Sequence, residues 1–160
     1  MLKIEHLTKV YSNGKKAVDD LSLIVEPGDI YGLIGANGAG KTSTIKSIVG
    51  IHDFDKGEIY ICGHSIRKEP LLCKKKMAFL PDNPDLYKNL TARQFLDFVA
   101  DIYRVSLEKR QAAIEKYSKM FELDTSLDQL ISAYSHGMKQ RLALIAALLH
   151  EPELLILDEP

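Results

Sequence analysis

The stretch GANGAGKT, residues 35–42, decides the fold, because its glycines, lysine and threonine match the pattern G-x-x-x-x-G-K-[ST] in full. Gly35, Gly38 and Gly40 permit backbone angles that other residues resist, so successive N–H groups can point toward one anion. The apolar run DIYGLIG at residues 29–35 predicts a central parallel strand, and KTSTIKSIVGI at 41–51 has the apolar spacing of a helix. A strand, a glycine-rich loop and a helix in this order predict a phosphate-binding loop.

The side chains of this loop are expected to hold the phosphates of a nucleotide together with its metal ion. Lys41 would bring a positive charge to the β- and γ-phosphates, and the Thr42 hydroxyl can bind Mg²⁺. The residues expected to contact the nucleotide here are Gly35, Ala36, Asn37, Gly38, Ala39, Gly40, Lys41, Thr42 and Ser43. The sequence therefore predicts an ATP site with Mg²⁺ as its metal.

A second stretch, LLILDEP at residues 154–160, supplies two carboxylates after an apolar run. A phosphate-binding loop needs a carboxylate on a neighbouring strand to hold the metal, and often a second one to polarise the attacking water. On its own, this ending would indicate a turn with solvated charges. Beside the full phosphate-loop pattern, we favour a strand over 154–157 with Asp158 at its carboxyl end, where open α/β sheets bind ligands.

The remaining patterns predict an α/β core interrupted by helices. Strands are expected at residues 2–7, 18–26, 56–63 and 77–82, the first two joined by an Asn13-Gly14 turn. Thr91 and Gln94 form a capping-box pattern, and Ser106 can cap a second helix over 107–121. A third helix is expected over 136–150. Lys74–Lys76 are expected to be solvent-exposed residues that lead into the strand at 77–82. We expect residues 1–84 to form a β part with the phosphate loop, 85–137 a helical part, and 138–160 the last helix and strand.

Composition restricts the partners. Lysine and arginine number 21 and the acidic residues 22, so the net charge of −1 gives no reason to expect a nucleic-acid partner. Two cysteines make no disulfide framework, which favours a reducing, cytosolic compartment. No stretch approaches the ~18 consecutive apolar residues of a membrane helix, so a role at the membrane would need a partner.

With these motifs in this order, the chain resembles the ATP-binding cassette (ABC) proteins, specifically the ATPase subunits of transporters. Residues 7–51 look like the family's N-terminal half, FLPD at 79–82 falls at its Q-loop, and YSHGMKQRLALIAALLHEPELLILDEP at 134–160 resembles its signature motif, helix and Walker B strand. The resemblance implies a P-loop NTPase with a RecA-like parallel-sheet core, an N-terminal antiparallel β part and a helical subdomain. It also implies ATP hydrolysis coupled to transport across a membrane.

The resemblance assigns roles to further residues. Tyr11 would stack on adenine, although it could equally be a hairpin tyrosine packed on the strand. Asp82 and Glu159 would act in catalysis, with Glu159 polarising the attacking water. Ser135 and Gly137 would cover the γ-phosphate of ATP held by a second ATPase subunit, although Ser135 alone would indicate only a helix cap. A transmembrane permease subunit would dock near residues 82–90, which would hold the protein on the cytoplasmic face of the membrane.

The sequence departs from the family pattern in three places. Tyr134, His136 and Met138 replace residues of the usual LSGGQ signature, and the resulting SxGMKQRL pattern resembles ATPases of ABC-2-type exporters. Asp82 stands where glutamine is usual; it is shorter and, when ionised, only accepts hydrogen bonds. The family continues beyond Walker B into a D-loop and a switch histidine, so we expect these 160 residues to be a fragment of the domain.

Two alternatives to a transporter ATPase follow from the same residues. The chain could be a nucleotide-binding fragment that turns ATP over poorly, because the D-loop and switch histidine are not in it. It could also belong to a soluble ABC protein outside transport, although such proteins usually carry two cassettes or a coiled-coil insertion.

Overall fold

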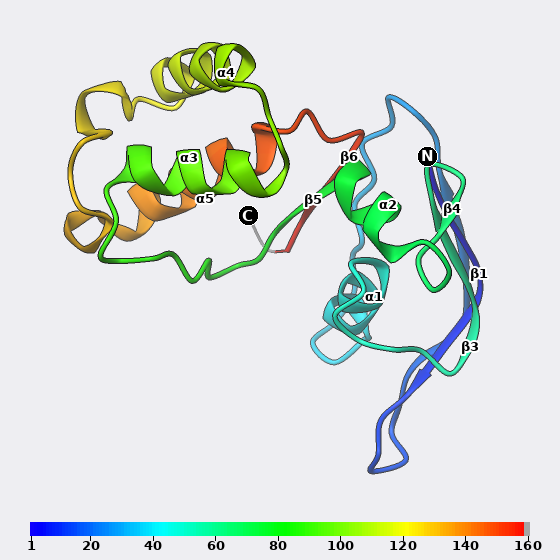
Figure 1. Ribbon diagram of the computed structural model, residues 1–160. Coiled ribbons are helices and arrows are strands. Elements are labelled where there is room, and N and C mark those ends of the chain that lie inside the picture. Colours follow the sequence, from blue (N-terminus) through cyan, green and yellow to red (C-terminus); the bar gives the residue numbers. More distant parts are fainter. Residues whose placement is uncertain (159–160) are drawn as a thin grey trace. The chain divides into compact units, whose positions relative to one another are not determined.

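The computed structural model describes residues 1–158, and this part of the chain divides after Met77 into two compact units, which are described separately. Figure 1 shows the helices and strands of both. In residues 1–158, no helix is both long and apolar enough to cross a membrane.

The first unit is built on an antiparallel sheet with the strand order β2-β1-β3-β4. Its strands are β1 (Leu2–Val10), β2 (Lys16–Val25), β3 (Lys56–Ile61) and β4 (His64–Ser65), and its helices are α1 (Lys41–Ile48) and α2 (Pro70–Lys76). Ile4, Leu7, Ile59 and Ile61 lie in the core, where each is almost fully buried. Ile59 and Ile61 follow the alternation of a strand, whereas Ile4 and Leu7 share a face because the pairing shifts between them. The strands predicted at 2–7, 18–26 and 56–63 and the helix after residue 40 are confirmed.

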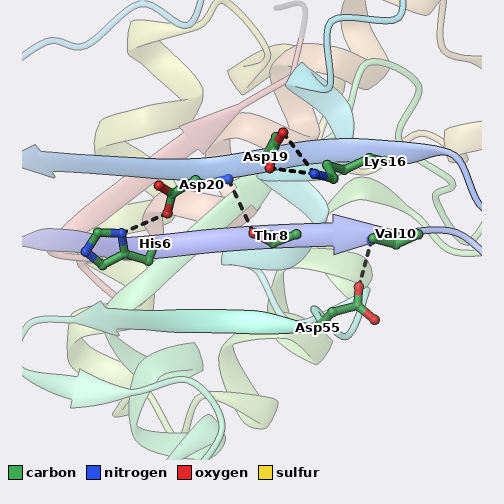
Figure 2. Close-up of polar contacts among 7 residues, drawn as sticks. All are labelled: His6, Thr8, Val10, Lys16, Asp19, Asp20 and Asp55. Atoms are coloured by element: carbon green, nitrogen blue, oxygen red, sulfur yellow. Dashed lines mark hydrogen bonds and ion pairs between the residues drawn. The ribbon is translucent and has the colours of Figure 1, made fainter.

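The pairing of β1 with β2 is irregular, and side chains compensate for it (Figure 2). His6 and Asp20 have positive φ angles of 51° and 53°, and their side chains meet at 2.8 Å between Nδ1 and Oδ1. The Asp20 amide donates to Thr8 Oγ1 at 3.3 Å, and the Val10 amide donates to Asp55 Oδ2 at 2.7 Å. Backbone N–H groups that the irregular strand pairing leaves without a cross-strand partner thus donate to neighbouring side chains.

The central strand predicted over residues 29–35 is wrong for this structure. These residues form no strand, and Ile34 is 95% exposed. An apolar run becomes a parallel strand only where other strands pair with it, and none of the strands that the structure describes pairs with these residues. Lys74–Lys76 lead directly into the strand at residues 77–80, as expected, and Lys74 and Lys75 are exposed; the structure adds that the three lysines form the last turn of α2.

The second unit combines helices with a short two-stranded sheet, β5 (Met77–Leu80) paired with β6 (Leu154–Leu157). Its helices are α3 (Ala92–Ile102), α4 (Leu107–Met120) and α5 (His136–Leu148), with short 3-10 turns η1 (Asp124–Ser126) and η2 (Ile131–Ala133). Leu96, Ile131, Leu142 and Ile145 lie fully buried in one apolar core between the helices. The three predicted helices and both strands are confirmed.

Local side chains start these helices as the sequence predicts. Thr91 Oγ1 accepts from the Gln94 amide at 3.2 Å, while Gln94 Oε1 accepts from the Thr91 amide at 2.9 Å, which completes the capping box of α3. Ser106 accepts from the Lys109 amide at the start of α4. The helix starts are therefore determined within a few residues of sequence.

Candidate functional site

The glycine-rich loop, residues 35–40, leads directly into α1, and its geometry depends on two glycines with positive φ. Gly38 has φ 82° and Gly40 has φ 91°. A Cβ on Gly40 would lie only 2.0 Å from the carbonyl oxygen of Ala17 on β2, so the loop runs against that strand without room for a side chain. The loop is also closed on itself by the Ala39 amide, which donates to the Ala36 carbonyl at 3.0 Å.

The amino end of α1 has no side-chain cap, because glycine is the residue at that position. The first amides of a helix have no partner within the helix, and its dipole is positive at this end, so an uncapped start favours an anion. Residues 35–39 and Thr42 are exposed, while Lys41 and Ser43 are half-buried. The loop residues predicted to contact phosphates are thus open to a ligand.

Lys41 lies across the loop. Its ammonium donates to the carbonyl oxygens of Gly35 at 2.7 Å and Ala36 at 3.2 Å. One side chain from the first turn of α1 therefore reaches back over the six residues of the loop. This brings a positive charge to the same place as the uncapped helix end, and together they form a positively polarised surface for an anion.

Tyr11, the predicted adenine-stacking residue, lies beside α1. Its hydroxyl is 2.9 Å from Ser43 Oγ and 3.5 Å from His52 Nδ1, and the His52 ring meets the tyrosine ring edge-on with centroids 6.0 Å apart. The structure therefore brings together Tyr11 and Ser43, which are 32 positions apart. The contact with His52 has no signal in the sequence, because nothing in its neighbourhood distinguishes it from a loop histidine.

The predicted carboxylates lie in the second unit. Asp158 is half-buried directly after β6, and its amide donates to the carbonyl of Leu80, the last residue of β5, at 3.0 Å. Asp82 is exposed, two residues after the end of β5. The two strands therefore end beside each other, and each is followed by one of the predicted carboxylates. Glu159 lies outside the described residues.

The metal site predicted from Thr42 and Asp158 uses one residue from each unit, so it stays a prediction. Both supply hard oxygen ligands, which is the chemistry that Mg²⁺ prefers. Among residues 1–158, no group of three or more histidine, cysteine, aspartate or glutamate side chains could hold a metal by itself.

Ser135 and Gly137 begin α5 and are both exposed. Ser135 Oγ accepts from the Met138 amide at 3.3 Å, so the serine caps the helix as its simpler interpretation predicts. A Cβ on Gly137 would meet no atom within 4 Å, so the space beside it is open. Their predicted action on ATP of a second subunit stays a prediction.

Comparison with known proteins fits this geometry. Residues 18–160 match the protein family described as ABC transporter. The chain belongs to the ABC transporter family.

Two curated relatives cover all of this chain. It is 41% identical over 160 residues to the bacitracin transport ATP-binding protein BcrA of Bacillus licheniformis, and it spans 51% of that protein. It is 36% identical over 160 residues to the SkfA peptide export ATP-binding protein SkfE of Bacillus subtilis, and it spans 66% of that protein. The chain thus covers between half and two thirds of these ABC proteins' lengths.

A solved structure of an ABC protein has the same fold. The dimeric structure of a post-hydrolysis state of the ATP-binding cassette MJ0796, bound to ADP and Pi, superposes with a TM-score of 0.85 at 25% identity, covering 98% of this chain and 73% of that one. The predicted fold class, an α/β P-loop NTPase with an antiparallel β part and helices, is confirmed.

Proposed function

We propose that this chain binds ATP and that the protein to which it belongs hydrolyses ATP to drive transport, in the direction of export. The observation that carries the proposal is the phosphate loop itself, in which Lys41 lies across the carbonyls of Gly35 and Ala36 beside an uncapped helix start. Export is supported by the SxGMKQRL pattern and by the likeness to SkfE, whose name states peptide export.

In this proposal each residue has one task. The amides of Gly38 to Gly40 and the ammonium of Lys41 bind the β- and γ-phosphates, and the Tyr11 ring takes the adenine. Thr42 and Asp158 would hold Mg²⁺, which when bound neutralises the charge on the phosphates. Glu159 would orient and polarise the attacking water, and Asp82 would accept a hydrogen bond from it. Catalysis of this kind consists of positioning and charge stabilisation, so each contact contributes to the rate.

A second ATPase subunit is the first proposed partner. Ser135 and Gly137 are exposed at the start of α5, with open space beside the glycine, so another molecule's phosphates can approach them. The similar MJ0796 structure is dimeric. We therefore propose a dimer with ATP between the subunits, in which residues 85–137 serve as the helical part that presents the signature.

A transmembrane permease subunit is the second proposed partner, with residues 82–90 at the contact. Tyr87, Phe98 and Ile102 are exposed here, and the Tyr87 and Phe98 rings meet edge-on with centroids 5.5 Å apart. Beside them lies a largely apolar cavity of about 370 Å³, lined in part by Phe95 and Leu86. An exposed apolar surface next to a cavity is typical of a protein contact. The protein would then lie on the cytoplasmic face of the membrane.

Two variants of the full-length protein test the nucleotide role. Lys41→Ala should weaken ATP binding about 10- to 150-fold, the equivalent of one charge-assisted hydrogen bond. Lys15→Ala, which removes an exposed lysine at the β1–β2 turn, should leave binding unchanged. Equal affinities of the two variants, measured by titration with a fluorescent ATP analogue, would refute the assigned site.

A third variant tests hydrolysis apart from binding. Glu159→Gln should retain ATP binding and lower phosphate release at least about 100-fold, as expected on loss of a catalytic base. Normal turnover by Glu159→Gln would remove this residue from the mechanism. Binding without turnover in the unmodified protein would favour the alternative of a module that only binds nucleotide.

A further inference from the structure

A second cavity lies in the first unit, apart from the phosphate loop. It has a volume of about 520 Å³ and is formed by four segments: the end of α1, the loop after it, residues 66–67 and α2. Ser47, His52, Phe54, Arg67 and Lys74 are among the residues that line it. This volume is in the range of cavities that bind small molecules.

The charge of this cavity is positive. Arg67 and Lys74 supply two permanent cations, and Asp53 is the one carboxylate in the lining. Within residues 1–158, neither cation forms an ion pair with a carboxylate. Two cations and one carboxylate leave a net positive charge on the lining, which favours an anionic ligand.

Arg67 is held in place without being neutralised. Its guanidinium lies over the Phe54 ring, 3.9 Å from the ring centroid, and it donates to the Phe54 carbonyl oxygen. Both contacts orient the guanidinium and leave its charge free, because neither partner is an anion. The remaining N–H groups of a guanidinium are suited to a carboxylate or phosphate.

The cavity is connected to the phosphate loop through two side chains. His52 lines the cavity, and its Nδ1 is 3.5 Å from the Tyr11 hydroxyl, which in turn lies 2.9 Å from Ser43 Oγ in the first turn of α1. Ser47, at the base of the cavity, donates to the Ser43 carbonyl at 2.9 Å. Because Nδ1 is the ring nitrogen of His52 that contacts Tyr11, a ligand that binds through this nitrogen competes with that contact.

We propose that this cavity is a regulatory site for a small anion carrying phosphate or carboxylate groups, held by Arg67, Lys74 and His52. Occupancy weakens nucleotide binding, because it draws His52 from Tyr11 and loosens the position of the tyrosine beside Ser43. The regulatory effect rests on the proposed ATP function, whereas anion binding at the cavity does not. The anion can be a soluble metabolite or a lipid headgroup, since both present the same chemistry.

The first experiment measures anion binding alone. The full-length protein with isotope-labelled histidine is titrated with citrate and, separately, with inorganic phosphate, and the His52 NMR signal is identified by its loss in His52→Gln. We expect a saturable shift of this signal. Lys74→Ala should weaken the binding about fivefold, as for one exposed charge contact, and Lys75→Ala, also exposed on α2 but outside the lining, should leave it unchanged. Equal effects of the two lysine variants on the binding of a soluble anion would overturn the site.

Anionic phosphatidylglycerol vesicles form the second arm of this titration. If they shift the His52 signal and the soluble anions do not, the headgroup is the ligand; if citrate or phosphate shifts it, the ligand is soluble. A lack of response to all three probes overturns the proposal.

The second experiment measures coupling to the nucleotide. Saturating citrate should lower the affinity for a fluorescent ATP analogue about fivefold, at the low end of typical allosteric couplings. Tyr11→Phe keeps the ring but removes the hydroxyl, so it should retain citrate binding and lose the coupling. A decrease of the same size in Tyr11→Phe would show that citrate acts without the contact between His52 and Tyr11, for example by competing at the phosphate loop, and would overturn the regulatory role. If ATP does not bind while citrate still shifts the His52 signal, the proposed ATP function fails and the anion site stands.

Discussion

Replacing Gly40 by alanine should destabilise the first unit through one identifiable clash. The new Cβ would lie 2.0 Å from the Ala17 carbonyl oxygen and 3.2 Å from its carbon, and both are backbone atoms that cannot rotate away. The positive φ of 91° costs an alanine about 1–2 kcal/mol, and the displacement needed to relieve the clash costs about 1–3 kcal/mol more. The free energy of unfolding should therefore fall by about 2–5 kcal/mol.

Gly38→Ala is the matched control, because it introduces the free-energy cost of a positive φ without the clash. Gly38 has a similar φ of 82°, but a Cβ there would meet nothing within 4 Å. This variant should lose only the ~1–2 kcal/mol of the unfavourable backbone angle. Gly40→Ala should thus be the less stable of the two by about 1–3 kcal/mol.

Urea unfolding followed by far-UV circular dichroism measures the difference. With a slope of about 2 kcal/mol per molar urea, the midpoint of Gly40→Ala should lie about 0.5–1.5 M below that of Gly38→Ala. Equal midpoints for the two variants would refute the reasoning, since they would mean that the approach of Ala17 does not constrain the loop.

Three further predictions concern the helices and the cysteines. Thr91→Ala should lower the free energy of unfolding by about 1 kcal/mol through loss of the α3 cap, and Thr91→Ser should restore it; no loss in urea unfolding would contradict the cap. Glu122 follows α4 with a φ of 55°, an angle that glycine adopts more easily than other residues. Glu122→Gly should therefore raise the free energy of unfolding by up to about 1 kcal/mol, and Glu122→Ala should not. A glycine variant that is less stable than the unmodified protein would count against this. Cys73 is fully buried, and burial raises the pKa of its thiol, so it should react more slowly than the half-buried Cys62. Peptide mapping after mild alkylation at pH 8 should find Cys62 modified first. Equal alkylation rates of the two cysteines would disprove the protection of Cys73 by burial.

The helix starts and the phosphate loop could be predicted from the sequence because their causes are local. The Thr91–Gln94 capping box acts within four residues, and the Ser135 cap is equally short in range. The glycine-rich loop likewise carries its backbone requirement in its own residues. Each of these features is therefore determined by a few consecutive residues.

Features that depend on distant partners could not be predicted in this way. Residues 29–35 have the composition of a central strand, but strand formation requires a neighbouring strand, which composition does not encode. The contact of His52 with Tyr11 joins residues 41 positions apart, and no pattern connects them. The helix α2 was missed because its seven residues are too few for an apolar repeat.

The irregular pairing of β1 and β2 has a consequence for the behaviour of the chain at high concentration. β2 is ten residues long and lies at one edge of its sheet, where the backbone groups of a strand can pair with those of another molecule. At Asp20 the strand bends out of the regular extended form, and the charged side chains of Lys16 and Asp19 are exposed on it. An incoming strand would have to follow this bend and desolvate these charges, so the edge of the folded protein is protected against intermolecular β-aggregation at high concentration.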